Sequence, residues 1–209
     1  MSQAANFPAI KMENSNYPDG WIKGILQTDF VKEPARNLLI DRLNKKPKLT
    51  PVFFDTESFS VLQCVCMRLI PQDRAKPIDL AGLLDEQLSE SPGNGWRYDA
   101  LPEDKTVFQQ GLKGIEQLSR MAFAKTFCDL DAAEMDQVLL AVQAGSARGN
   151  VWDDLPSHLF FEELLASLVE LYYSHPVAKE EIGDISFADA KGWKNFGLDQ
   201  TEQPNPFTV

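Results

Sequence analysis

Apolar residues recur three and four positions apart through most of this chain, and that spacing governs what it can fold into. Between residues 55 and 176 several such segments follow one another. Residues at this spacing share one side of an α-helix, which other helices must cover. Clear alternation of apolar and polar residues, the pattern of a half-buried strand, is absent. The sequence therefore predicts an all-α protein, a helical bundle of five or six helices.

Local signals place the helices along the chain. Expected starts lie at Asp55, near Leu80, near Pro102, at Asp131 and near Pro156. Asp131 and Glu134 have the spacing of a capping box, and Gly145 is placed to end that helix. Gly111 and Gly114 fall inside the third helix of this series, where each costs about 1 kcal/mol relative to alanine. Close packing against another helix would explain both glycines.

The last of these helices is apolar over an unusually wide arc. One face carries Phe160, Leu164, Leu168 and Leu171, and beside it lie Phe161, Leu165, Val169 and Tyr172. A helix that is apolar over most of its circumference is usually central to a bundle or covered by another chain.

Prolines and a change in charge divide the chain into three parts. Residues 1–50 are an N-terminal arm with a short helix over 35–43; they carry eight Lys and Arg against five Asp and Glu. Residues 51–176 form the helical body. Residues 177–209 have no sustained period and are predicted to be an extended, irregular C-terminal tail, whose aromatic side chains need a surface to lie on.

Composition excludes several classes of function. A net charge of −11 argues against nucleic-acid binding, which needs a positive surface. No apolar run approaches the roughly 18 residues that cross a bilayer. The first fifty residues show neither the basic and apolar segments of a signal peptide nor a twin-arginine pair.

The cysteines and histidines do not form a predicted catalytic, cofactor or metal site. Cys64 and Cys66 lie two apart on a helix and point in different directions, so they cannot bond to each other. A disulfide from either one to Cys128 fits a protein that works outside the cytoplasm, and the sequence leaves the choice open; Cys66 is predicted to pack in the core. His158 and His175 stand at opposite ends of one helix, roughly 25 Å apart at about 1.5 Å per residue, and His175 is expected to cap its C-terminus.

The order of elements resembles a known family, the gluconate 2-dehydrogenase subunit 3 family, over about residues 53–198. The segments that carry the resemblance are 62–71 (LQCVCMRLIP), 127–140 (FCDLDAAEMDQVLL), 160–173, Ser174-His175-Pro176 and 192–197 (GWKNFG). In that family an apolar helix ends at an aromatic-x-x-Pro step, and a loop with Gly-Trp-x-x-x-Gly follows.

The resemblance implies a non-catalytic small subunit of a membrane-associated sugar or polyol dehydrogenase. The large subunit, of the glucose–methanol–choline type, carries the FAD and the catalytic residues, and a cytochrome or another carrier takes the electrons. The small subunit helps the large one to fold and be exported. Because this sequence shows no twin-arginine signal, the resemblance leaves two locations, the periplasm as part of an exported complex or the cytoplasm.

We therefore expect this chain to bind an FAD-containing partner and to hold no cofactor of its own. The predicted partner-binding residues are Tyr172, Tyr173, Pro176, Gly192, Trp193, Phe196 and Gly197. Desolvated aromatic residues dominate interface energetics, which is why they lead this set. The alternative for the aromatic residues is that they close the bundle's own core. The alternative for the whole chain is a self-associating helical scaffold or regulator without a flavoprotein partner.

Overall fold

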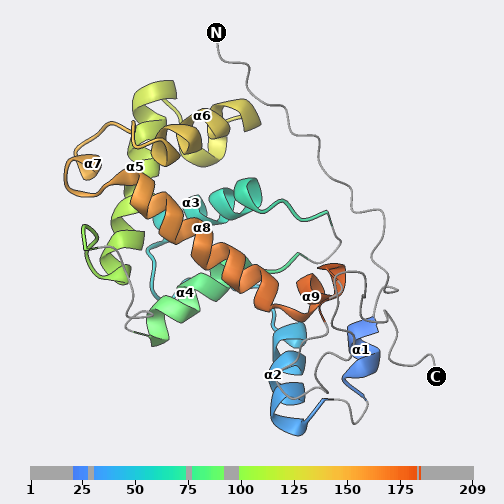
Figure 1. Ribbon diagram of the computed structural model, residues 1–209. Helices are drawn as coiled ribbons and strands as arrows, with labels where there is room; N and C mark the ends of the chain where they lie inside the picture. Colours follow the sequence, from blue (N-terminus) through green and yellow to red (C-terminus); the bar gives the residue numbers. More distant parts are fainter. Residues whose placement is uncertain (1–20, 28–30, 74–76, 92–98, 183, 185–209) are drawn as a thin grey trace, which may run out of the picture. The chain divides into compact units, whose positions relative to one another are not determined.

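The computed structural model describes residues 21–27, 31–73, 77–91, 99–182 and 184 (Figure 1). Over these residues the secondary structure consists of α-helices and one short 3-10 helix, without a strand. The predicted all-α class is confirmed. In the same ranges, no helix combines the length and the apolar character needed to cross a membrane.

The chain forms two compact units. The body unit is residues 46–173, and the terminal unit combines residues 1–45 with residues 174–209. Described residues from the predicted arm and from the predicted tail thus belong to one unit.

The body unit is built from helices that follow the predicted starts closely. They are α3 (Thr56–Leu69), α4 (Leu80–Glu90), α5 (Asp104–Phe123), η1 (Phe127–Asp129), α6 (Ala132–Gln143), α7 (Val151–Asp154) and α8 (Ser157–Ser174, whose last residue belongs to the terminal unit). The sequence did not predict η1 or α7, which are only three and four residues long. Such short helices contain too few residues to show a period.

Side-chain caps fix where these helices begin. Asp55 accepts a hydrogen bond from the Ser58 N–H at 2.7 Å. The capping box before α6 is confirmed: Asp131 accepts from the Glu134 N–H at 2.9 Å, and Glu134 accepts from the Asp131 N–H at 3.0 Å. Gly145, just beyond α6, has a φ of 69°, a left-handed conformation that glycine adopts at little cost.

The core of the body unit forms where α5 meets its neighbours. Leu112 and Ile115 of α5 are fully buried. A Cβ added at Gly111 would lie 2.1 Å from the ring of Phe160 on α8, and one at Gly114 would lie 2.4 Å from Trp152 on α7. The two glycines are therefore required by close packing, as the sequence suggested.

The terminal unit contains α1 (Trp21–Ile25), α2 (Glu33–Asn44) and α9 (Pro176–Ile182). Among its described residues, five apolar side chains form a buried cluster: Ile22, Ile25, Leu26, Val31 and Leu39. The N–H of Ile22 donates to Glu180 of α9 at 2.8 Å, and Arg42 of α2 donates to the Ser174 carbonyl at 2.7 Å. These hydrogen bonds join α1 to α9, and α2 to the last residue of α8.

Two features of this unit differ from the sequence prediction. Helix α9 occupies the start of the segment expected to be irregular. It has only seven residues, and the helices that it contacts, α1 and α2, lie more than 130 positions earlier in the chain. His175, which the sequence placed at the end of the long helix, also begins the next one: its carbonyl accepts from the Lys179 N–H at 3.1 Å. Its Nδ1 accepts from the Val177 N–H at 3.2 Å, and its Nε2 lies 3.1 Å from the Arg42 carbonyl oxygen. His175 thus lies at the N-terminus of α9 and contacts the backbone of α2.

Candidate partner-binding site

Three of the predicted partner-binding residues fall in the described part of the chain. Tyr172 is 9% exposed and Pro176 is buried, whereas Tyr173 is 44% exposed. A buried side chain offers a partner little surface, so Tyr173 is the member of this group that a second protein can cover. Gly192, Trp193, Phe196 and Gly197 lie outside the described residues, and their role stays a prediction.

Among the described residues, part of the apolar arc of helix α8 is not covered. Phe160, Leu164 and Leu168 are fully buried against the body unit. Next to them runs a line of apolar side chains one turn apart, which we call the α8 stripe: Leu165, Val169 and Tyr173. Leu165 is half-buried, Val169 is 39% exposed and Tyr173 is 44% exposed. The width of the apolar pattern was the sequence signal for this surface.

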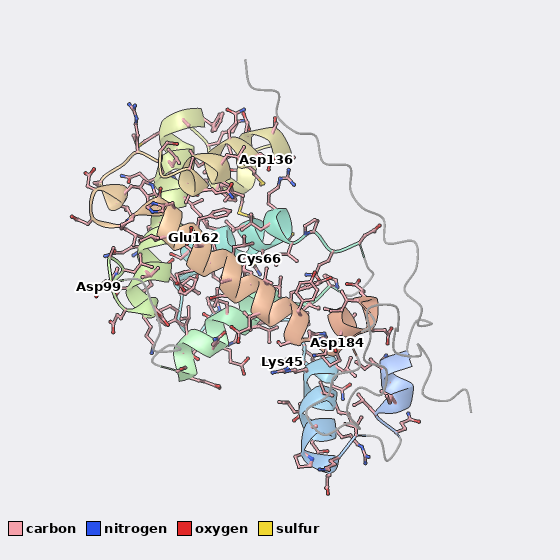
Figure 2. All side chains as sticks on the ribbon, in the orientation of Figure 1. Lys45, Cys66, Asp99, Asp136, Glu162 and Asp184 are labelled. Atoms are coloured by element: carbon pink, nitrogen blue, oxygen red, sulfur yellow. A yellow bond between two sulfur atoms is a disulfide. The ribbon has the colours of Figure 1, made fainter. Side chains whose placement is uncertain are left out.

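Two glutamates each lie three positions before a residue of the α8 stripe, Glu162 before Leu165 and Glu170 before Tyr173, and are therefore its neighbours on the helix. Glu162 and Glu170 are exposed on the same helix, and Glu162 is labelled in Figure 2. Burial raises the pKa of the neighbouring Glu163, and the negative charges of Asp104 and Glu162 add to that shift.

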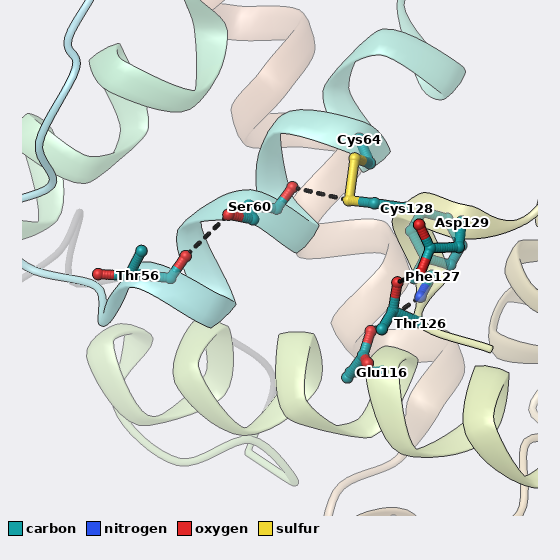
Figure 3. The surroundings of a disulfide bond; sticks show 8 residues. All are labelled: Thr56, Ser60, Cys64, Glu116, Thr126, Phe127, Cys128 and Asp129. Carbon is teal, nitrogen blue, oxygen red and sulfur yellow. Dashed lines mark hydrogen bonds between the residues drawn. A yellow bond between two sulfur atoms is a disulfide. The ribbon is translucent and has the colours of Figure 1, made fainter. Parts of the chain in front are cut away.

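A disulfide between Cys64 and Cys128 joins α3 to η1, with 5.7 Å between the Cα atoms (Figure 3). Of the two pairings that the sequence left open, the structure selects Cys64. Cys66 is buried and does not take part in the disulfide, so its predicted place in the core is confirmed. Burial raises the pKa of the Cys66 thiol above its ordinary range, with a further contribution from Asp79.

A buried carboxylate supports the same corner of the body. Glu116 of α5 accepts from the Phe127 N–H at 2.9 Å and from Arg120 at 2.7 Å. Phe127 itself is fully buried beside the disulfide residue Cys128. Two separate contacts, one covalent and one polar, thus hold η1 in place.

Asp85 of α4 forms a second buried contact that sequence reasoning missed. Its side chain is fully buried and accepts from three successive backbone N–H groups, those of Val52, Phe53 and Phe54, at 2.8 to 3.0 Å. Lys48 Nζ lies 3.1 Å from the same carboxylate. The sequence does contain a signal for this contact: Asp85 lies within a leucine-rich helix face, and a charged residue buried at such a position needs polar partners.

A groove of about 460 Å³ lies between α3 and α5. Val61 and Leu112 contribute its apolar floor. Ion pairs join its charged walls: Arg120 to Glu57 at 3.1 Å, and Lys113 to Asp55 at 4.0 Å. These groups neutralise one another rather than converging on the middle of the groove. Within the described ranges, no group of three or more His, Cys, Asp or Glu residues is placed to hold a metal ion.

The described residues define a class of protein: a small helical protein whose body is closed by a disulfide and whose α8 stripe is partly exposed. Residues 56–196 match the family Gluconate 2-dehydrogenase subunit 3, and the chain belongs to that family. The resemblance of the sequence to this family is therefore confirmed. The family is a subunit of a dehydrogenase complex. No curated protein is significantly similar to this chain, and no solved structure is either.

Proposed function

We propose that this chain is the non-catalytic small subunit that binds and stabilises the FAD-containing catalytic subunit of a glucose–methanol–choline-type sugar or polyol dehydrogenase. The family match over residues 56–196 carries the proposal, because that family is a subunit of a dehydrogenase complex. In the proposed division of work, the partner binds FAD and the sugar, and a cytochrome or another carrier accepts the electrons. This chain binds the catalytic subunit and stabilises its fold.

The proposal includes an oxidising compartment, the periplasm, which the chain reaches together with its catalytic partner. The Cys64–Cys128 disulfide supports this location, because disulfides persist in exported proteins and are rare where cytosolic thiols keep cysteines reduced. The test is to trap thiols in the native cell with an alkylating reagent. We expect one alkylated cysteine per denatured chain, Cys66, and two more after reduction; three alkylated cysteines before reduction would contradict an oxidising location.

The test of the function itself is co-expression with the catalytic flavoprotein subunit of the same genome. We expect the tagged chain to purify as a yellow complex containing flavin, while the chain alone is colourless. The catalytic subunit produced without it should be less soluble and should melt at a lower temperature. A flavoprotein equally soluble and stable without this chain, together with a tagged chain that purifies as a homodimer, would refute the proposal and favour the self-associating alternative.

A further inference from the structure

We infer that the α8 stripe is the docking surface for the catalytic subunit, and that the matching surface of that subunit is apolar with a rim of Lys and Arg. This inference rests on the proposed function and adds to it the place of contact and the chemistry of the partner.

The α8 stripe is continuous with the core-facing side of its helix. Leu165, Val169 and Tyr173 follow one another at intervals of four residues, so their side chains stack along one line. They lie directly beside the arc formed by Leu164 and Leu168, which are fully buried. A protein covering the stripe therefore extends an existing apolar face, in the manner of a helix laid against a hydrophobic groove.

Tyr173 has the properties of an interface anchor. Its ring meets that of Tyr172 edge to face, with 5.1 Å between the centroids, and Tyr172 is buried. A ring supported in this way loses less conformational freedom on binding than an unsupported side chain. Tyrosine is also among the residues that most often dominate interface energies.

Charge decides what kind of surface can cover the stripe. Glu162 and Glu170 flank it, and the whole chain carries a net charge of −11. A second copy of this chain would bring the same acidic groups to the contact, and like charges brought together at an interface are costly. A partner with Lys and Arg around an apolar centre gains attraction at the rim and burial at the middle.

Other exposed apolar residues of the body unit provide a control. Leu140 of α6 is 59% exposed, more than either Val169 or Tyr173, and its helix neighbour Asp136 is paired with Arg68. Single exposed apolar residues are normal on protein surfaces, whereas in the α8 stripe two exposed residues continue the half-buried Leu165 on adjacent turns and form a patch. Leu140→Glu therefore makes the same chemical change as Val169→Glu at a position outside the stripe.

The experiment measures the dissociation constant between the full-length chain and the purified catalytic subunit. We expect Val169→Glu and Tyr173→Ala each to weaken binding about 10-fold or more, with Leu140→Glu within about 2-fold of wild type. We expect the double variant Glu162→Lys/Glu170→Lys to weaken binding and to reduce its salt dependence. Glu90→Lys, at the exposed end of α4, is the control for one such charge reversal away from α8 and should bind as wild type does. The melting temperature of each isolated variant shows that the fold is retained.

Each result has a definite meaning. If the wild-type chain binds the flavoprotein and the stripe variants bind equally well, the docking surface is wrong while the proposed function stands. If the wild-type chain does not bind it, the proposed function fails and this inference fails with it. A wild-type homodimer that Val169→Glu dissociates would identify a second copy as the occupant and overturn the inference. Tighter binding by the double Lys variant would refute the prediction that Lys and Arg surround the apolar centre of the partner's surface.

Discussion

Replacing Asp85 by asparagine gives the sharpest test of how the body unit is held together. The carboxylate Oδ1 accepts from the N–H groups of Phe53 and Phe54, and Oδ2 accepts from Val52 and Lys48. Asparagine keeps one oxygen, which is enough for two of these donors. Its amide NH₂ then faces the other two donors, the Val52 N–H and Lys48 Nζ, and cannot accept a hydrogen bond from either.

The size of the effect follows from those two lost contacts. A buried donor left without an acceptor costs about 1–3 kcal/mol. With the oxygen turned to Phe53 and Phe54, the Val52 N–H loses its acceptor, and Lys48, with 24% of its side chain exposed, loses its ion pair but can turn partly to water. We therefore expect Asp85→Asn to lower the free energy of unfolding by about 3 kcal/mol.

The measurement is urea unfolding of the oxidised protein at pH 7, followed by circular dichroism. Asp99→Asn, at an exposed position, is the matched control and should stay within about 0.5 kcal/mol of wild type. A loss below about 1 kcal/mol for Asp85→Asn would refute the reasoning, because it would mean that the four contacts contribute little net stability.

The same contact predicts a dependence on pH. Burial by itself raises the pKa of Asp85, but the backbone N–H groups and Lys48 outweigh it and hold the pKa below its ordinary value. A carboxylate with a lowered folded-state pKa stabilises the protein above its unfolded pKa of about 3.9, and that stability is lost as the pH falls further. The difference between wild type and Asp85→Asn should therefore narrow below about pH 4; a constant difference down to pH 2 would contradict it.

Three further predictions concern the body unit. Reducing the Cys64–Cys128 disulfide, whose cysteines are 64 positions apart, should lower the free energy of unfolding by about 4 kcal/mol according to the chain-entropy model. The loss should appear as a lower melting temperature in reductant, and an unchanged melting temperature would contradict it. Cys66 should resist thiol reagents at pH 8 in the folded protein and react once it is unfolded, because burial raises its pKa; rapid labelling of the native chain would place it at the surface. Gly111→Ala should destabilise the body by about 1–3 kcal/mol in urea, because its Cβ meets the Phe160 ring; a neutral effect would show that the two helices separate easily.

The amino-acid sequence by itself determined the helices of the body. Apolar periodicity located α3, α4, α5, α6 and α8, and local capping chemistry fixed where several of them begin. The capping box at Asp131 and Glu134 involves residues three apart, so its geometry is local and readable from sequence. The family could also be recognised at this level, because its motifs are short segments in a fixed order.

Tertiary structure alone decided which distant groups meet. The choice of Cys64 over Cys66 as the partner of Cys128 depends on which side of α3 faces η1, and the burial of Asp85 depends on where the segment before α3 passes α4. The joining of α1, α2 and α9 likewise pairs segments more than 130 residues apart. Helix periodicity reports only which side of a helix is apolar. Which part of that side the protein's own core covers, and which part of α8 stays open, is set by the packing of the whole chain.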